Sequence, residues 1–296
     1  MGGADVVPGV SGGTIAFITG IYEELLDSIN AINLESLRLL IRFKLKEFWE
    51  TVNGNFLLTL FSGILISLFS LAKLISFLIE FYPIQLWSFF LGLILISAVL
   101  VLKKIKKWSG GVVFTVIAGS IIAYLLTASA PKETGDGLVT IFFSGMIAIT
   151  AMILPGISGS YILLILGKYE MMVNAIKDLR IVILIVFALG CVAGLVTFSR
   201  IISWVLKKYH NLTVGLLAGF MVGSLNRIWP WKEVLQYRIN SQGDQVPVFD
   251  RSILPNQYLQ ITGQDPHFLQ ALLFICMGIF FVVLFERIAN WTSHKS

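Results

Sequence analysis

Long apolar stretches dominate the chain, and two of them are interrupted by nearly the same short motif. The first interruption is Pro8–Gly13 (PGVSGG), and the second is Pro155–Ser160 (PGISGS), 147 residues later. Further identities at the same offset pair Ala4 with Ala151, Gly20 with Gly167, Tyr22 with Tyr169 and Glu23 with Glu170. A duplicated break in hydrophobic segments is the best indication of a transporter binding site that a sequence gives.

Each interrupted stretch is too short on either side of its break to cross a bilayer as one helix, which takes about 20 apolar residues. We therefore predict two re-entrant hairpins of two half-helices each, over residues 4–30 and 138–176. Residues 31–54 have apolar positions at helical spacing with basic residues between them. This pattern is typical of an amphipathic helix that lies on the membrane surface.

Six further apolar runs are long enough to span a bilayer. Three follow the first hairpin and three follow the second, with a short turn at 131–137 between the halves. The predicted spans are residues 55–79, 84–102, 111–130, 181–206, 211–229 and 268–286. Residues 230–267 form a polar outer loop with four prolines, the only sizeable extramembrane segment in this prediction.

The composition indicates a membrane protein rather than a soluble one. Of the 296 residues, 56% are hydrophobic and 13% are charged, and the mean hydropathy is +0.85, whereas a soluble domain carries about 25% charge. The net charge of +5 then reflects where the loops lie, and we expect no nucleic-acid partner. The two cysteines and three histidines are scattered, so we expect neither a disulfide nor a metal site.

The positions of lysine and arginine predict which side of the membrane each loop faces. Placing Lys103–Lys107 in the cytoplasm also puts Lys207–Lys208, residues 31–54 and the C-terminus there. The turn and the outer loop then lie outside. All short loops agree only if each broken segment enters and leaves on one side, so the first hairpin opens inward and the second outward.

A second offset, of 127 residues, relates the spans of the two halves. It pairs Gly63 with Gly190, Lys73 with Arg200, Ser76 with Ser203, Tyr82 with Tyr209, Gly92 with Gly219 and Ser97 with Ser224. Each half thus comprises one broken hairpin and three spans, over residues 1–130 and 138–296. Because three is odd, the halves have opposite orientations. The predicted fold is an all-α integral membrane protein with two inverted-topology repeats.

The two breaks contain the groups that an anion site needs. Unpaired backbone groups cost several kcal/mol each in hydrocarbon, so a break persists only where protein or a wet cavity surrounds it. Helix N-termini, glycines and hydroxyls then face an anion such as a phosphate. The candidate residues are Ser11, Gly12, Gly13, Thr14, Ser158, Gly159 and Ser160. The alternative is a pair of helix kinks that bind nothing.

Three basic residues are candidates for contact with an anion along its path. Lys73 lies toward the outer end of its span and Arg200 toward the inner end of the equivalent span, so we predict one cation near each mouth. The alternative for both is snorkelling to the interface. Arg227, close to two tryptophans, either receives a headgroup or is an exposed arginine in the interfacial aromatic belt.

Three carboxylates are candidates for ion coupling. Glu23 and Glu170 follow the tyrosines that end the hairpins, and they either cap structure or bind a proton or sodium ion. Asp5 has Met152 as its counterpart, so it marks a difference between the halves. Neither Ser11 nor Ser158 has a His or Lys base nearby in sequence. We therefore expect no catalytic residue. We also expect no cofactor, and a proton gradient, a sodium gradient and simple downhill flow all fit the sequence as the driving force.

The motif residues resemble a bacterial membrane family that is now associated with polyprenyl-phosphate transport, the PopT family, formerly a domain of unknown function. The resemblance covers essentially the whole chain. It rests on residues 4–14 (ADVVPGVSGGT), 20–23 (GIYE), 154–160 (LPGISGS) and 223–231 (GSLNRIWPW). Such proteins have a further helical stretch before the first motif, matching 138–149 here. We therefore expect either a shortened chain or a first hairpin that lacks its leading arm.

The resemblance implies that the chain moves undecaprenyl phosphate, the lipid carrier of wall-polymer synthesis, from the outer to the cytoplasmic leaflet of the bacterial inner membrane for reuse. The expected partners are this lipid and the bilayer. Two alternatives stay open: a secondary transporter of a small soluble anion and a membrane enzyme such as a lipid phosphatase. The soluble-anion transporter predicts an enclosed cavity without a lateral opening to lipid. The membrane enzyme requires Ser11 or Ser158 to act as a nucleophile.

Overall fold

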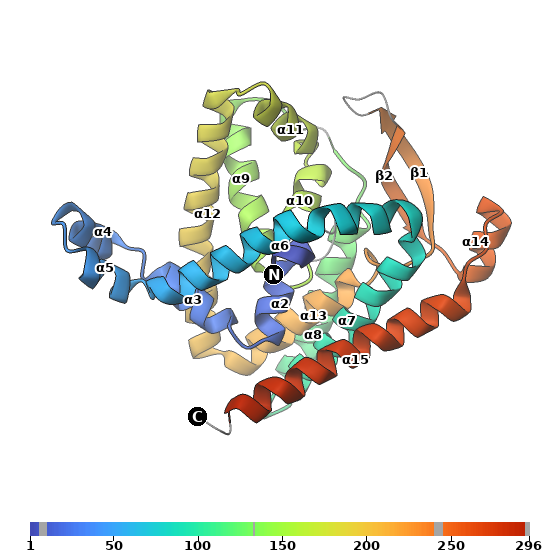
Figure 1. Ribbon diagram of the computed structural model, residues 1–296, viewed down its shortest axis with the longest axis horizontal. Coiled ribbons are helices and arrows are strands. Elements are labelled where there is room, and N and C mark those ends of the chain that lie inside the picture. Colours follow the sequence, from blue (N-terminus) through green and yellow to red (C-terminus); the bar gives the residue numbers. More distant parts are fainter. Residues whose placement is uncertain (6–10, 133, 240–244, 294–296) are drawn as a thin grey trace.

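The computed structural model describes residues 1–5, 11–132, 134–239 and 245–293, and its fold is mostly helical (Figure 1). Within these ranges, five helices are long and apolar enough to cross a membrane, so the chain is a multi-pass membrane protein. Pro8, Gly9 and Val10 of the first motif lie outside the described residues.

The five candidate spans are α6, α7, α8, α12 and α15, and they match five of the six predicted spans. The sixth, predicted at 211–229, is α13, which has 15 residues and ends at Ser224 before a tight turn. The order of elements is α1 (Gly2–Asp5), α2 (Gly12–Ile18), α3 (Tyr22–Asn30), α4 (Leu34–Ile41), α5 (Leu45–Thr51), α6 (Gly54–Phe81), α7 (Pro83–Lys103), α8 (Gly110–Thr127), α9 (Leu138–Ile153), α10 (Gly159–Ile165), α11 (Tyr169–Lys177), α12 (Ile181–Lys208), α13 (His210–Ser224), β1 (Lys232–Ile239), β2 (Gln245–Ser252), α14 (Pro255–Thr262) and α15 (Phe268–Ser293).

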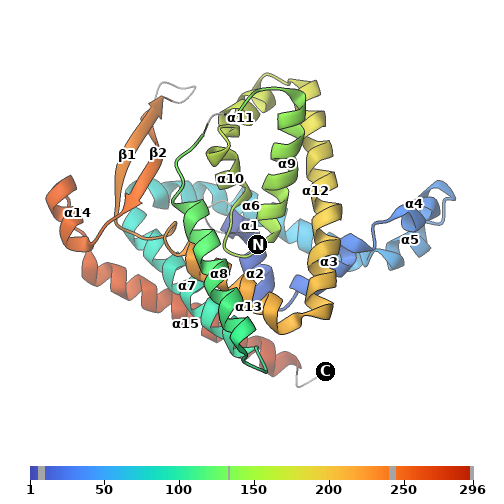
Figure 2. The ribbon, with the colours of Figure 1, turned by 180° about the vertical axis from the view of Figure 1, so that it is seen from behind.

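Two segments differ from the prediction. Residues 31–54 form two short helices, α4 and α5, which project from the body of the protein in both views (Figures 1 and 2). Residues 230–267 contain the antiparallel strands β1 and β2 and the helix α14, and this small hairpin is an addition to the all-α membrane fold that was predicted. Pro247 lies in β2, and proline and charged residues are tolerated there because in a two-stranded sheet both strands are edges.

Helix boundaries in the second half repeat those of the first. The helices α2 and α3 recur 147 residues later, with the same lengths, as α10 and α11. The turns between them also match, because Gly20 and Gly167 have φ angles of 80° and 67°. Glycine is favoured at both turns since other residues rarely adopt this left-handed conformation.

The 28-residue helices α6 and α12 show the same relation at an offset of 127 residues. Each ends in a corner at a tyrosine, Tyr82 before α7 and Tyr209 before α13. The φ and ψ angles are −135° and 48° at the first corner and −130° and 50° at the second. The offsets found in the sequence thus also relate helix lengths and backbone angles.

Close helix crossings recur in pairs as well. α7 crosses α15 where Gly92 and Gly278 each lie against a backbone carbonyl of the other helix. α8 crosses α13 in the same way through Gly119 and Gly219. Small residues allow backbones to approach this closely. The short helix α2 contacts both α7 and α9, which places the described part of the first motif, from Ser11 onward, in the middle of the protein (Figure 1).

The repeat provides a matched pair of variants for the packing of α9 on α12. A Cβ atom at Gly190 would collide with the backbone of Phe142 in α9, whereas one at Gly63, its equivalent in α6, meets no described atom within 4 Å. We expect Gly190→Val to destabilise the protein by about 1–3 kcal/mol through overpacking. Gly63→Val should change stability much less. Thermal unfolding in detergent checks both, and equal losses would contradict this packing.

Candidate functional site

The first broken segment is held by its own polar groups. Ser11 caps α2 by accepting a hydrogen bond of 3.1 Å from the backbone N–H of Gly13. The carboxylate of Asp5 accepts a second one, of 2.7 Å, from the N–H of Gly12. The other carboxylate oxygen of Asp5 is buried and has no hydrogen-bond partner among the described residues. The N-terminus of α2 therefore faces a carboxylate from α1.

The two broken segments contact each other directly. The hydroxyl of Ser11 donates to the carbonyl oxygens of Met152 and Leu154, at 3.0 and 3.2 Å. In the opposite direction, the N–H of Gly156 donates to Oγ1 of Thr14 at 2.8 Å. We call these five residues the motif interlock. Its bonds satisfy backbone groups that the breaks leave without helical partners.

The second motif also packs against α13. Gly156 has a φ of 90°, and a Cβ atom there would collide with the carbonyl oxygen of Phe220 and the hydroxyl of Ser224. The hydroxyls of Ser158 and Ser160 lie 2.8 Å apart, and Ser158 makes no side-chain bond to the N-terminus of α10. One hydroxyl proton of this pair therefore has no acceptor among the described residues.

The predicted motif residues lie in the interior of the protein. Ser11 and Thr14 have no exposed surface, and Ser158 is 6% exposed. The glycines Gly12, Gly13 and Gly159 are buried too. The structure thus brings the two motifs together, but the described contacts run through the motif interlock and not between the two serines.

Arg227 lies beside the second motif and binds a carboxylate. Its guanidinium carbon is 4.5 Å from the ring centre of Tyr161, the residue after Ser160. Its Nη1 atom donates to both oxygens of Asp250 in β2, each at 2.8 Å. Lys232 of β1 is 3.2 Å from the same carboxylate. The sequence analysis missed this cluster because Asp250 and Lys232 belong to no motif.

The other predicted charged residues lie on the helices α6, α12, α3 and α11. Lys73 and Arg200 are exposed on α6 and α12, and neither has a hydrogen-bond or ion-pair partner among the described residues. Glu23 is at the surface, 3.7 Å from Nε2 of His210. Glu170 lies in the first turn of α11. The described contacts do not connect Lys73, Arg200 or Glu23 to the motif interlock.

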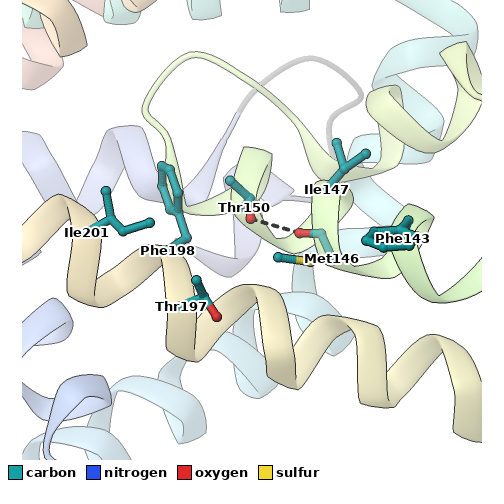
Figure 3. Close-up of a pocket in the computed structure, with 7 residues that line it drawn as sticks. All are labelled: Phe143, Met146, Ile147, Thr150, Thr197, Phe198 and Ile201. Atoms are coloured by element: carbon teal, nitrogen blue, oxygen red, sulfur yellow. Dashed lines mark hydrogen bonds between the residues drawn. The ribbon is translucent and has the colours of Figure 1, made fainter.

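An apolar groove of about 350 Å³ lies between α9 and α12 (Figure 3). About half of the surface of Phe143, Ile147 and Ile201 is exposed, so the groove opens to the side of the protein. The Thr150 hydroxyl donates to the carbonyl of Met146 and leaves the groove almost wholly apolar. The full lining is Phe143, Met146, Ile147, Thr150, Thr197, Phe198 and Ile201.

These features define a class of protein. Broken apolar segments that meet in the middle of a multi-pass membrane protein are typical of the binding sites of transporters. The groove reaches Thr150, which lies within one helical turn of Met152 of the motif interlock on α9.

Comparison with known proteins gives the family. Residues 1–246 match the VCA0040-like family, described as undecaprenyl phosphate translocase-like, and the chain belongs to that family. A polyprenyl-phosphate transporter of Vibrio cholerae serotype O1 is 46% identical over 290 residues, which are 98% of this chain and 94% of that protein. One of Staphylococcus aureus is 35% identical over 251 residues, covering 78% and 83%. No solved structure matches. The predicted family is confirmed.

The bond between Thr14 and Gly156 should hold the two motifs together. Thr14→Val keeps the side-chain shape but leaves the buried N–H of Gly156 without its acceptor, which costs about 1–3 kcal/mol. We therefore expect a lower unfolding temperature in detergent. Thr19→Val is the control, since that exposed hydroxyl bonds only to carbonyls of its own helix. Equal stability of the two variants would show that the bond does not link the motifs.

Proposed function

We propose that this protein transports a polyprenyl phosphate across the membrane, the activity for which its relatives in Vibrio cholerae and Staphylococcus aureus are named. The observation that carries the proposal is the buried motif interlock beside a laterally open apolar groove. A lipid phosphate has two matching parts. Its charged headgroup needs polar contacts to cross the hydrocarbon, while its tail can stay in the apolar phase.

The groove favours a lipid over a small soluble anion. A soluble anion requires an enclosed polar cavity, whereas this groove is lined by apolar side chains and opens sideways. A lipid phosphatase is disfavoured because the Ser11 hydroxyl donates to two carbonyl oxygens instead of to a basic side chain. We therefore assign transport and no catalytic chemistry.

The repeated helix boundaries support two inverted-topology repeats over residues 1–130 and 138–296. The offsets of 147 and 127 residues relate the broken segments, the long helices and the corners after them. If α6, α7 and α8 each cross the membrane once, the second half starts on the opposite side from the first. We treat both broken segments as re-entrant hairpins because α2 and α10, with seven residues each, are too short to span.

Within this arrangement the site residues have separate roles. The motif hydroxyls and amides contact the phosphate near the middle of the membrane, Lys73 and Arg200 attract it at the two mouths, and Arg227 meets it outside. Asp5 is our first choice for a coupling proton or sodium ion because one of its oxygens is buried without a partner among the described residues. The complete set is Ser11, Gly12, Gly13, Thr14, Ser158, Gly159, Ser160, Lys73, Arg200 and Arg227, with Asp5, Glu23 and Glu170 for coupling.

The basic clusters set the proposed orientation. With Lys103–Lys107 and Lys207–Lys208 in the cytoplasm of a bacterial cell, the C-terminus is cytoplasmic and the β1–β2 hairpin is outside the inner membrane. Transport then runs from the outer to the cytoplasmic leaflet. It returns the lipid carrier for another round of wall-polymer synthesis.

A leaflet-specific assay in cells tests this function. In a strain without other transporters of the same lipid, depletion of this protein should make polyprenyl phosphate accumulate on the outer surface, where a membrane-impermeant phosphate-binding reagent detects it. Expression of the wild-type chain should reverse the accumulation. Unchanged surface exposure would contradict the proposed function, and accumulation on the cytoplasmic side would contradict the direction.

A further inference from the structure

Arg227, Lys232, Asp250 and Tyr161, which we call the Arg227 cluster, carry a buried excess of positive charge. The side chains of Arg227 and Lys232 are each 14% exposed, and that of Asp250 is 18% exposed. Two cations therefore share one carboxylate where little water can compensate them. Among the described residues, the cluster therefore has two cations and one anion. A charge that is not compensated is costly to bury, so the cluster would be stabilised by a second anion.

Two further observations also indicate that the Arg227 cluster has too little negative charge. The Nε atom of Arg227 is buried and has no acceptor among the described residues. The pKa of Lys232 is lowered to about 8, chiefly by burial and then by the positive charge of Arg227, although Asp250 acts in the opposite direction. Its ammonium group also lies 5.7 Å from the ring centre of Trp87 in α7. The ammonium also donates to the carbonyl oxygen of Arg227, which is a neutral acceptor. Among the described residues, Asp250 is thus the one anion in contact with both cations.

The Arg227 cluster is held against the end of α8 and adjoins the second motif. The Tyr161 hydroxyl donates to the carbonyl of Thr127 at 2.8 Å, which fixes the ring against the end of α8. The ring in turn supports the guanidinium of Arg227. Because Tyr161 and Ser158 lie on successive turns of the same short segment, an anion bound at Arg227 is close to the second motif.

We propose that the Arg227 cluster is a phosphate-binding site in which the Asp250 carboxylate occupies the place of the ligand. A phosphate monoester carries more negative charge than a carboxylate and has three acceptor oxygens, so it can compensate both cations and pair with arginine through two N–H groups. Binding displaces Asp250 and loosens the β1–β2 hairpin. That the phosphate is a lipid headgroup rests on the proposed function, whereas the site fits any phosphate monoester.

Removal of the competing carboxylate tests the site. Asp250→Asn keeps the side-chain shape, and it should tighten binding of inorganic phosphate and of polyprenyl phosphate about tenfold, because the charge-assisted bonds to Asp250 no longer have to be broken. Binding is measured by calorimetric titration of the purified chain in detergent. Glu233→Gln is the matched control. It makes the same charge change on the same hairpin, in an exposed pair with Arg251, and should leave both affinities unchanged.

The outcomes separate this site from the proposed function. Unchanged or weaker phosphate binding by a folded Asp250→Asn variant would overturn the site and show that the cluster only fastens the hairpin to α13. Tighter binding of inorganic phosphate without any binding of polyprenyl phosphate would support the site and contradict the proposed function. Binding of polyprenyl phosphate that Asp250→Asn does not change would support the function and overturn the site.

The pH dependence of phosphate binding provides a second readout, which does not require Asp250→Asn to fold. Lys232 loses its proton around its pKa of about 8, while a phosphate monoester is fully ionised there. Wild-type affinity should therefore fall between about pH 7.5 and 9.5. The charged groups that face Lys232 are Arg227 and Asp250, and Tyr161 lies against Arg227. Lys232→Arg should abolish the fall, and a flat wild-type profile would overturn the role of Lys232.

A second inference comes from a difference between the two halves. α3 packs against α12 with polar contacts between Asn30 and Ser199 and at Asp27. Asp27 accepts hydrogen bonds from Ser203 and Lys207 at 3.0 and 2.7 Å. By the two offsets, the equivalent residues are Asn174 in α11 and Ser76 and Glu80 in α6. The side chains of these three have no hydrogen-bond or ion-pair partner among the described residues.

We infer that Asn174 meets Ser76 and Glu80 in a second state, in which α11 packs on α6 and the contact between α3 and α12 opens. Inverted repeats can exchange conformations in this way, so that access alternates between the two sides. The chemistry is complementary, because the amide of Asn174 can donate to Glu80 much as Lys207 donates to Asp27. The inference rests on the proposed inverted repeat.

Cysteine cross-linking tests the exchange in a chain whose Cys191 and Cys276 are replaced by alanine. The pair Asp27→Cys and Ser203→Cys should cross-link in the state described here, and the pair Asn174→Cys and Ser76→Cys should cross-link in the other. Each cross-link should stop transport, and reduction should restore it. Failure of the second pair to cross-link in a chain that transports would overturn the exchange and leave the transport function intact.

Discussion

The rest of the structure depends on one constraint, that backbone groups inside a membrane protein need hydrogen-bond partners. Each broken segment leaves carbonyl and N–H groups without helical partners, and the motif interlock pairs those of the second segment with side chains of the first. Ser11 serves the carbonyls at the end of α9, and Thr14 serves the N–H of Gly156. The two halves are therefore fixed to each other at the point where both helices break.

At two positions that favour an anion, the negative charge comes from a carboxylate of this chain. Asp5 accepts from the first N–H of α2, and Asp250 lies between Arg227 and Lys232. In both places the anion comes from a segment next to the site. At the Arg227 cluster, the proposed phosphate replaces the Asp250 carboxylate instead of filling an empty space. This exchange keeps an anion beside the two cations at every stage, which lowers the cost of holding them within the protein.

Much of the fold follows from local sequence patterns, whereas much of the site does not. The spans and broken segments were predictable because apolar length and duplicated glycines act locally, and the offsets that pair Tyr82 with Tyr209 apply to the backbone angles as well. The β1–β2 hairpin and the ion pair between Arg227 and Asp250 were not, because they depend on contacts between segments that share no pattern. The roles of Lys73 and Arg200 stay predictions, since both side chains are exposed.

The central claim is that the substrate phosphate binds between the two motifs. A polyprenyl phosphate with a photoreactive group next to the phosphate, cross-linked in proteoliposomes and mapped by mass spectrometry, tests it most directly. The account predicts labelling within residues 11–14 and 155–161, suppressed by excess unlabelled polyprenyl phosphate. Labelling confined to the lipid-facing sides of α6 or α15, or labelling that the unlabelled lipid does not suppress, would contradict it.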